Sequence, residues 1–425
     1  AALLGLVWCQ PWSGVLLFVA VIAVLPFGVI PVPVAGAQLT LVDAMLLATY
    51  SAVLGRSLFG RRPLPLGTTG VALLGLAMVM CAAFVASAAT SAAPPELVRR
   101  VAKLIAGVLF FVVARALLVQ PGRVEQLLRW LMVAGAIQGA VGGLLTLLPP
   151  PTQLALLSSL RVVGYPTTDV LRYVPGPNDT YTTQLRAIGT SVDPNVFGGT
   201  LMLALTCMIV QWSCPRPVLQ RPLLLLLALP TSLGVLLSLS RASWLGLAVA
   251  LLLVGFLRYR RILGLAALAA AALLLTRAGQ DVVQRFVRGL SAADRATAFR
   301  LGEYANAWTL IQRYPLLGIG FGLSPDIDVT AGVSSVYLLV AEQTGLIGLA
   351  LFLLAVGSAW VGGLRALGRV EDARRQSLIA TLLAAVSAAL VAGLLDHYFA
   401  NHLFPHAVAL FWLYVAALTR VSEAD

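Results

Sequence analysis

The chain has 425 residues, of which 60% are hydrophobic and only 11% are charged. Soluble domains carry roughly 25% charged residues, so this composition excludes a water-soluble enzyme, a disordered chain and a disulfide scaffold. The formal net charge of +12 comes from short basic clusters between apolar runs, which is typical of membrane proteins and not of a nucleic-acid-binding surface.

Apolar runs of about 20 residues recur along the whole chain and predict an all-α, polytopic helical membrane protein with about twelve transmembrane helices. We treat residues 1–425 as a single integral membrane domain, and we interpret the apolar start as the trimmed terminus of the first helix region, with no cleavable signal peptide evident. The predicted spans lie at 13–34, 38–55, 66–90, 97–119, 124–148, 194–213, 222–240, 242–257, 261–276, 335–363, 376–397 and 404–420.

Arginines follow every even-numbered span. They include Arg61 after the second span, Arg123 after the fourth, Arg216 after the sixth, Arg260 after the eighth and Arg374 after the tenth. The positive-inside rule places these connections, and with them both termini, in the cytoplasm.

Two long polar connections then fall on the outer side, at 149–193 and 277–334. Both hold arginines where the positive-inside rule disfavours them, which indicates a bound anion. The alternative is that acids of the second connection balance its arginines. That connection is expected to contain an amphipathic helix over 298–313, and its Gly318, Gly320 and Gly322 are expected to form a flexible loop, not a dinucleotide site.

Residues 186–195 (RAIGTSVDPN) open the sixth span. Asp193 before Pro194 predicts a helix N-terminus, with an N-cap oxygen followed by proline at the first helical position. Such a helix end favours an anion, and Arg186 and Asn195 lie beside it in the sequence. Plain capping is the alternative.

Four further cations stand at the outer ends of spans. Arg241, in residues 238–244 (SLSRASW), lies at the membrane boundary, where a ligand phosphate or a lipid headgroup would satisfy it. Arg99, Arg100 and Lys103 begin the fourth span, where they would hold a lipid pyrophosphate or ordinary anionic headgroups.

A few ionisable residues lie within or at the end of late spans, and such residues are functional candidates by default. They are Glu342, Asp396, His397, His402 and His406. The spacing of the histidines does not suit a metal, so we expect a general base or a packing residue here.

Four stretches together resemble the O-antigen ligase and polymerase superfamily. They are residues 186–195, 238–244, Arg300 through 315–320 (PLLGIG), and 337–348 (YLLVAEQTGLIG). The ligases carry a histidine, one further residue and then Asn, Ser or Gln ahead of two glycines. Here Ser335, Gly345 and Gly348 fit, but the histidine position is Val333, which favours a polymerase or an atypical ligase.

The resemblance implies inverting glycosyl transfer on the periplasmic side of the bacterial inner membrane, without cofactor or metal. The donor would be a glycan on undecaprenyl pyrophosphate, the acceptor a glycan or glycolipid hydroxyl, and a chain-length regulator protein a possible partner. Arg186, Arg241 and Arg300 are expected to clamp the pyrophosphate, with Arg285 and Arg288 as further substrate-binding candidates. Asp326, Asp328, Glu303 or His397 would act as the base, and Asp326 and His397 are the preferred candidates.

A transporter or flippase for lipid-linked saccharides is the alternative function. Transporters usually carry charges near the bilayer midplane. Here the cations gather in the outer loops, and charge within the spans is nearly limited to Glu342 and Arg115. This distribution favours the enzyme.

Overall fold

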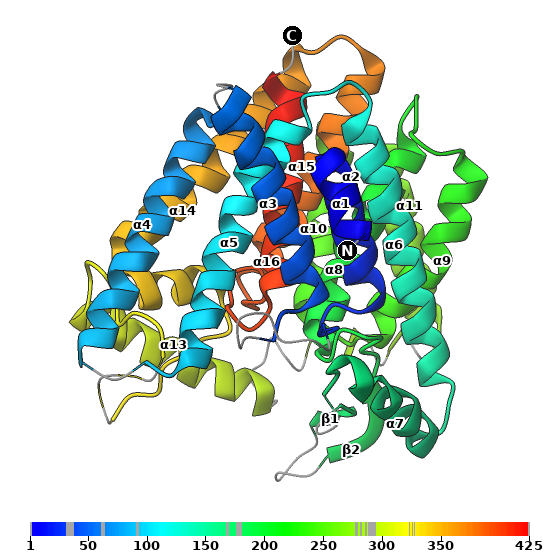
Figure 1. Cartoon of the computed structure of the whole chain (residues 1–425). Coiled ribbons are helices and arrows are strands. Elements are labelled where there is room, and N and C mark those ends of the chain that lie inside the picture. Colours follow the sequence, from blue (N-terminus) through cyan, green and yellow to red (C-terminus); the bar gives the residue numbers. More distant parts are fainter. Residues whose placement is uncertain are drawn as a thin grey trace.

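Each predicted span contains a helix in the computed structural model (Figure 1), but the helix of the first span, predicted over 13–34, ends at Val24. The structure describes residues 2–30, 38–60, 64–90, 93–166, 170–175, 181–276, 279–280, 283–284, 287, 295–322, 324, 326 and 328–423. The first half of the bundle contains α1 (Ala2–Cys9), α2 (Pro11–Val24), α3 (Leu41–Gly60), α4 (Gly67–Thr90), α5 (Pro95–Leu117) and α6 (Arg123–Thr146).

The first long connection follows α6 and holds α7 (Pro150–Ser159), the 3₁₀ helix η1 (Leu160–Val163) and an antiparallel hairpin of β1 (Arg172–Pro175) and β2 (Tyr181–Arg186). Four further spans are α8 (Pro194–Ser213), α9 (Arg221–Leu237), α10 (Arg241–Leu257) and α11 (Arg261–Leu275). The chain ends with α13 (Arg295–Arg313), α14 (Val336–Arg369), α15 (Ala373–Ala392) and α16 (Pro405–Glu423).

Six of these helices, namely α3, α4, α6, α8, α14 and α15, are long and apolar enough to cross a membrane. Helices α2, α9, α10 and α11 are shorter but also apolar. This arrangement confirms the predicted polytopic helical fold, whereas the count of about twelve crossings stays a prediction.

The connections that follow the even-numbered spans lie together at one end of the bundle, which we call the basic end. Arg374, after α14, binds both carboxylate oxygens of Glu125 at the start of α6, each at 2.5 Å. Arg129 of α6 donates to the carbonyl of Val218, before α9, at 3.1 Å. The opposite end, which we call the loop end, carries α7, the hairpin and α13 (Figure 1).

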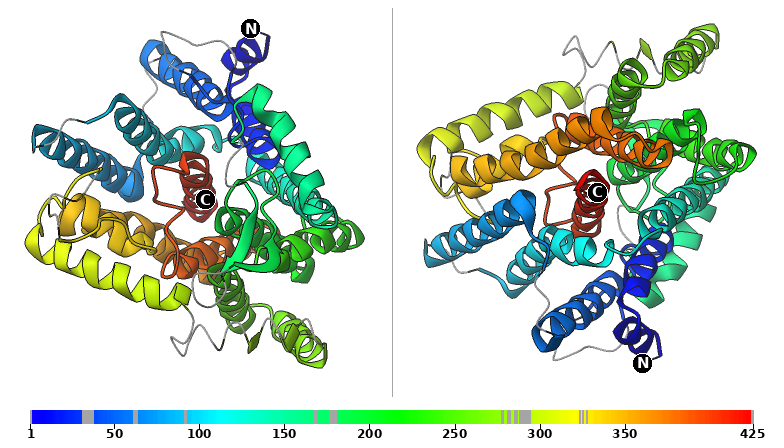
Figure 2. Two further views of the ribbon diagram at one scale, coloured as in Figure 1. Left: turned by 90° about the horizontal axis from the view of Figure 1, so that it is seen from below. Right: turned by 90° about the horizontal axis from the view of Figure 1, so that it is seen from above.

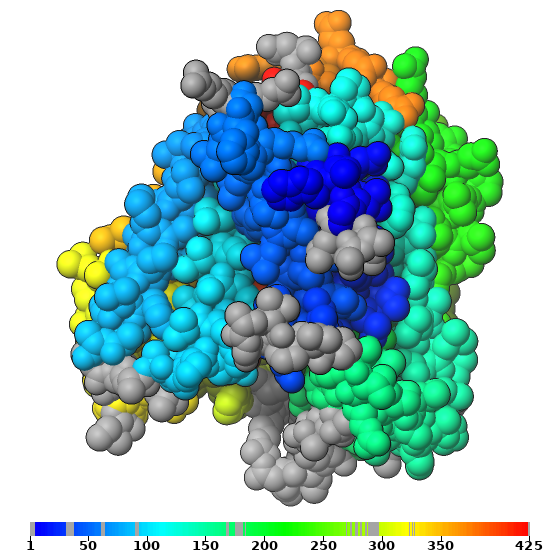
Figure 3. Space-filling view, in the orientation of Figure 1, coloured from blue at the N-terminus to red at the C-terminus, as the bar shows by residue number. Residues whose placement is uncertain are grey.

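Helix α16 forms the centre of the fold, with the other helices arranged around it (Figure 2). Every residue from His406 to Thr419 is buried, and the helix packs against α5, α14 and α15. A helix that is apolar on all sides belongs in the interior. The outer helices instead expose apolar side chains, such as Val71, Met78 and Val85 of α4, which suits contact with lipid. Helix α4 lies on the face shown in Figure 3.

Glycines on α6 bring the start of α8 close to the bundle. A Cβ on Gly142 would lie 2.2 Å from the ring of Phe197, and one on Gly139 would lie 2.5 Å from the carbonyl oxygen of Pro230 in α9. Small residues allow this approach between membrane helices. The contact fixes the position of the residues that precede α8.

Helix α14 is interrupted at Gly345, which has φ of 68°. The segment 315–320 fills the interruption, because Ile319 and Gly320 donate to the carbonyls of Glu342 and Gln343 at 2.8 and 3.1 Å, and Leu346 donates to Pro315 at 2.7 Å. Gly318 and Gly320, for which the sequence predicts a flexible loop, therefore belong to a segment that forms backbone hydrogen bonds with α14. These bonds replace the helical hydrogen bonds that are lost at the interruption.

The predicted amphipathic helix over 298–313 is present as α13, and the sequence predicts its apolar stripe at Leu301, Tyr304, Ala305, Trp308 and Ile311. Ala307, Leu310 and Ile311 are buried, whereas Leu301 and Trp308 are 52% and 58% exposed. The predicted stripe had included both exposed residues. Their side chains suit the membrane interface, where tryptophan is favoured.

Substitution Gly345→Ala tests the interruption of α14. A Cβ there would lie 2.0 Å from the backbone oxygen of Leu316 and the residue would keep a left-handed φ. We expect a loss of about 2–4 kcal/mol of stability, seen as a clearly lower Tm in detergent. Gly357→Ala is the matched control in the same helix, because nothing lies within 4 Å of its Cβ position, and it should be neutral or stabilising. Equal Tm values for the two variants would show that the interruption of α14 does not require glycine at position 345.

Candidate functional site

Arg186, at the end of β2, joins two segments at the loop end. Its Nε donates to the carbonyl of Ser238 at 2.9 Å, and its NH2 donates to Oδ1 of Asn195 at 2.5 Å. The next residue, Ala187, donates its backbone N–H to Leu237 at 2.9 Å. These bonds hold the hairpin against the start of α8 and the turn between α9 and α10.

Asp193 is the N-cap of α8, as the sequence predicts. Its Oδ1 accepts from the backbone N–H groups of Asn195 and Val196 at 2.7 and 3.1 Å, and Pro194 occupies the first helical position. The carboxylate therefore satisfies two amides of the helix end. The amide side chain of Asn195 is directed at Arg186.

The turn between α9 and α10 is built from buried serines. The hydroxyl groups of Ser240 and Ser243 are 3.0 Å apart, and Ser240 is the N-cap of α10. A Cβ on Gly198 would lie 2.6 Å from Oγ of Ser238, so the turn packs directly on the start of α8. This packing places Arg241, the first residue of α10, beside the segment that carries Arg186.

Arg241 and Arg300 are connected through α13. NH1 of Arg241 lies 3.4 Å from Oγ1 of Thr297, and Thr297 is three residues before Arg300, so the two share a face of the helix. NH2 of Arg300 lies 3.8 Å from Oδ2 of Asp396, in the loop between α15 and α16. Both members of this pair are largely buried, with side chains 23% and 6% exposed.

Asp396 contacts Arg300 of α13 and the adjacent His397. Burial raises the pKa of this carboxyl, against the lowering effects of His397 and Arg300, while the charge of Asp193 raises it further. The pKa of Asp396 thus depends on charges at the start of α8 and on α13. We call the connected set the arginine ring; it consists of Arg186, Asn195, Asp193, Ser238, Arg241, Thr297, Arg300 and Asp396.

Two residues beside the ring have left-handed backbone conformations although neither is glycine. Val192 has φ of 63° and Leu239 has φ of 52°. Such conformations cost roughly 1–3 kcal/mol each and gather at functional sites, and they are especially unusual for a β-branched residue. Val192 directly precedes Asp193, the N-cap of α8, and Leu239 lies between Ser238 and Ser240 in the turn before Arg241.

His397 lies at the edge of the ring. Its Nδ1 is 3.6 Å from Oδ1 of Asp396, and its side chain is 27% exposed. The same Oδ1 accepts from the backbone N–H of His397 at 2.9 Å. The carboxyl group therefore faces the imidazole, and the ring keeps access to solvent.

The other predicted residues are engaged elsewhere. Arg99 and Arg100 pair with Glu96 on the same helix turn. Nζ of Lys103 lies 2.7 Å from Oδ2 of the buried Asp43, so it connects α5 to α3. None of these contacts tests the proposed lipid-binding role, which stays a prediction.

Asp326 and Ser335 also have structural partners. NH1 of Arg313 lies 2.7 Å from Oδ2 of Asp326, and Tyr314 donates to its other oxygen at 3.2 Å. Ser335 is buried and donates to the carbonyl of Gly393 at 3.3 Å. Arg285 and Arg288 lie outside the described residues.

Val333, at the position where the ligases carry a histidine, packs with Ala307 and Leu339 between α13 and α14. It is buried, and the adjacent Ser334 donates its backbone N–H to Glu303 at 3.0 Å. This position is therefore part of the contact between two helices and offers no proton acceptor.

Several residues that support the ring have no clear sequence signal. Gln138 of α6 donates to Ser191 at 2.7 Å and accepts from Thr200 at 3.1 Å, which ties the residues before α8 to α6. Tyr398 covers Gly199, where a Cβ would lie 2.3 Å from its hydroxyl. A buried amide and a buried tyrosine in apolar runs look like packing residues until the tertiary contacts are known.

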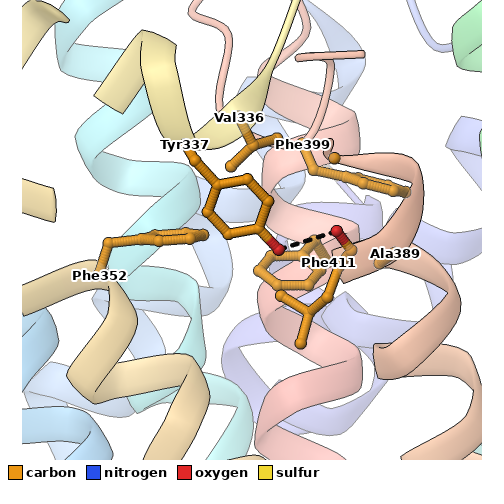
Figure 4. A pocket seen from close by; sticks show the side chains of 8 residues that line it. Val336, Tyr337, Phe352, Ala389, Phe399 and Phe411 are labelled. Carbon is orange, nitrogen blue, oxygen red and sulfur yellow. Dashed lines mark hydrogen bonds between the residues drawn. The ribbon is translucent and has the colours of Figure 1, made fainter. Parts of the chain in front are cut away.

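Two small cavities lie inside the bundle. One, with an empty volume of about 200 Å³, is lined by aromatic side chains below the α15–α16 loop, and Tyr337 there donates to the carbonyl of Leu390 at 2.8 Å (Figure 4). The other, of about 320 Å³, lies between α2, α6, α8 and α16 and reaches Gln138 and Thr200. Both are mainly apolar and carry none of the ring arginines.

His402 provides a test of the charge at this end. Burial, and then the charges of Arg100 and His397, lower its pKa to about 4, below the value of about 6.5 for an unfolded chain. Between pH 4 and 6.5 the unfolded state therefore binds more protons, so stability rises with pH and is lost on acidification. We expect Tm to fall between pH 7 and 5, and we expect the fall to be smaller in His402→Asn. An unchanged pH dependence of Tm in the variant would contradict the assignment of His402 as a neutral imidazole in the folded protein.

Residues 223–353 match the family model described as O-antigen ligase, which confirms the predicted superfamily resemblance. The matched segment includes Arg241 and Arg300, whereas Arg186 and Asp396 lie outside it. No curated protein matches the chain significantly. Among solved structures, the chain is similar to a chain of a peptidoglycan synthase complex that coordinates polymerization and crosslinking, with 17% identity over 83% of this chain and 98% of that chain and a TM-score of 0.39. A likeness this weak defines neither fold nor function.

Proposed function

We propose that this chain, whose residues 223–353 match the family model described as O-antigen ligase, is a membrane glycosyltransferase that moves a glycan from undecaprenyl pyrophosphate to an acceptor hydroxyl. The observation that supports it is the arginine ring, in which Arg186 contacts the α9–α10 turn, Arg241 contacts α13, and Arg300 of α13 faces the α15–α16 loop at one end of the bundle. Guanidinium groups bind phosphate oxygens in planar, paired geometry.

The reaction requires charge stabilisation more than covalent help from the protein. The acceptor oxygen attacks the anomeric carbon on the face opposite the pyrophosphate, and the carbon–oxygen bond to phosphate breaks with inversion. The bonding electrons pass to the leaving phosphate oxygen. Arg186, Arg241 and Arg300 neutralise that oxygen in this proposal, so no metal ion is required. A preorganised donor at a developing anion contributes about 2.7–4 kcal/mol.

His397 is the base that the geometry favours. It lies beside Asp396, which also contacts Arg300. The proposed proton acceptor, His397, and the proposed phosphate ligand, Arg300, therefore share the carboxylate of Asp396. Asp326 is held by Arg313 and Tyr314 instead. In this scheme the acceptor hydroxyl gives its proton to the imidazole, and Asp396 stabilises the imidazolium that forms.

The buried Val333 favours a polymerase or an atypical ligase over a ligase that uses a histidine at that position. The arginines of the basic end favour a cytoplasmic position for that end under the positive-inside rule, in the bacterial inner membrane of this proposal. The ring then faces the periplasm, where lipid-linked glycans would enter from the bilayer and a chain-length regulator would dock beside the enzyme.

Arg300→Ala should reduce glycan transfer by at least about 100-fold while the protein still folds, because one charge donor to the leaving group is lost. The measurement is elongation of a defined undecaprenyl-pyrophosphate glycan by purified protein, resolved on a gel. Arg313→Ala is the matched control on α13, since Arg313 pairs with Asp326 and Asp328 outside the ring.

Full activity of Arg300→Ala would remove the clamp from the mechanism. Movement of the lipid-linked glycan into sealed vesicles without any new glycosidic bond would instead identify a transporter. A ladder of products would indicate a polymerase, and a single shift with a glycolipid acceptor would indicate a ligase.

His397→Gln should lower the transfer rate by about 100-fold or more, which is the usual contribution of a general base. Asp396→Asn should lower it less. The double variant should be no slower than His397→Gln, because Asp396 acts through the imidazole and the two losses are not additive. Additive losses, or a fully active His397→Gln protein, would assign the proton to another group.

A further inference from the structure

The β1–β2 hairpin places a second arginine opposite the first ring arginine. Arg172 and Arg186 are directly paired across the two strands, as are Tyr173 and Leu185. Residues directly opposite in an antiparallel pair lie on the same face, with Cβ atoms about 4.5–5.5 Å apart. Arg172 therefore extends the arginine ring outward along the hairpin.

The two faces of the hairpin differ in chemistry. Tyr173 and Leu185 are half-buried on one face. Gln184 is exposed and lies two residues before Arg186, so it shares the face of the two arginines. That face offers two cationic groups and one amide, a combination that binds carboxylate or phosphate oxygens together with neighbouring hydroxyl groups.

A pair of like charges at directly opposite positions destabilises a hairpin. Arg172 is exposed, and no acidic residue in the described part of the chain forms an ion pair with it. The positive-inside rule also disfavours arginine at this end. An anion bound at Arg172 would balance the charge of this exposed residue.

We infer that Arg172, with Arg186 and Gln184, forms a subsite on the hairpin for an anionic group of the substrate. This inference rests on the proposed function and names a feature of the substrate, namely a carboxylate or phosphate close to the transferred linkage. Because Arg186 belongs to the ring, the subsite adjoins the proposed pyrophosphate position and recognises the part of the donor that projects from the membrane mouth.

The test compares two donors in phosphatidylcholine nanodiscs, one undecaprenyl-pyrophosphate glycan with a uronic acid as the first sugar and one with a neutral sugar. Arg172→Ala should weaken binding and raise KM for the acidic donor by about 5- to 10-fold with little change in kcat, as expected for an exposed charge-assisted contact. Arg172→Lys should recover part of the loss. Arg161→Ala is the control, because Arg161 is exposed in the same connection but outside the strand pair.

A loss confined to the acidic donor would assign the subsite to a sugar carboxylate. An equal loss for both donors, absent in Arg161→Ala, would assign it to the pyrophosphate. Arg172→Ala binding both donors as tightly as Arg161→Ala does would overturn the inference. If the wild-type protein transfers neither donor, the proposed function fails, but the binding comparison still decides the role of Arg172.

Discussion

A guanidinium group at the mouth of a membrane bundle requires oxygen atoms around it, because it cannot lose its charge and has limited access to water. This requirement shapes the loop end. Arg186 is met by a backbone carbonyl and an amide oxygen, Arg241 lies near a hydroxyl, and Arg300 faces a carboxylate. These partners come from α8, the α9–α10 turn, α13 and the α15–α16 loop, so satisfying three charges also fixes how four segments meet.

Holding these four segments together strains the backbone at two residues, and neighbouring contacts support the strained conformation. Val192 and Leu239 keep left-handed conformations beside the ring, and neighbouring contacts must hold them there. Gln138 binds on both sides of the first strained residue, and the buried serines surround the second. Strain held in this way is typical of a functional site, where position matters more than stability. The glycine contacts of α6 and the filled break in α14 supply the stiffness behind it.

The sequence predicts local features of this fold well. Apolar run length locates the helices of the predicted spans but not α1 or α7, the arginines after even-numbered spans share an end, and the Asp193–Pro194 pair marks the start of α8. Features that depend on distant partners are not predictable in this way. Nothing near residues 315–320 indicates that they bond to the backbone of 342–346, and Asp396 lies 96 positions from its partner, Arg300. The sequence of α13 predicts an apolar stripe but not which of its apolar residues are buried, because membrane-facing and core-facing residues are equally apolar.

The partner of Arg300 also bears on how a proposed catalytic cycle would start. A separation of 3.8 Å leaves the Arg300–Asp396 contact without a close hydrogen bond, and a phosphate dianion is the stronger ligand for a guanidinium. Pyrophosphate binding would therefore draw Arg300 away from Asp396. The released carboxylate would then face the imidazole of His397, whose Nδ1 lies 3.6 Å from its Oδ1. Under the proposed function, donor binding would thus free Asp396 to stabilise the imidazolium of His397 only when a leaving group is in place.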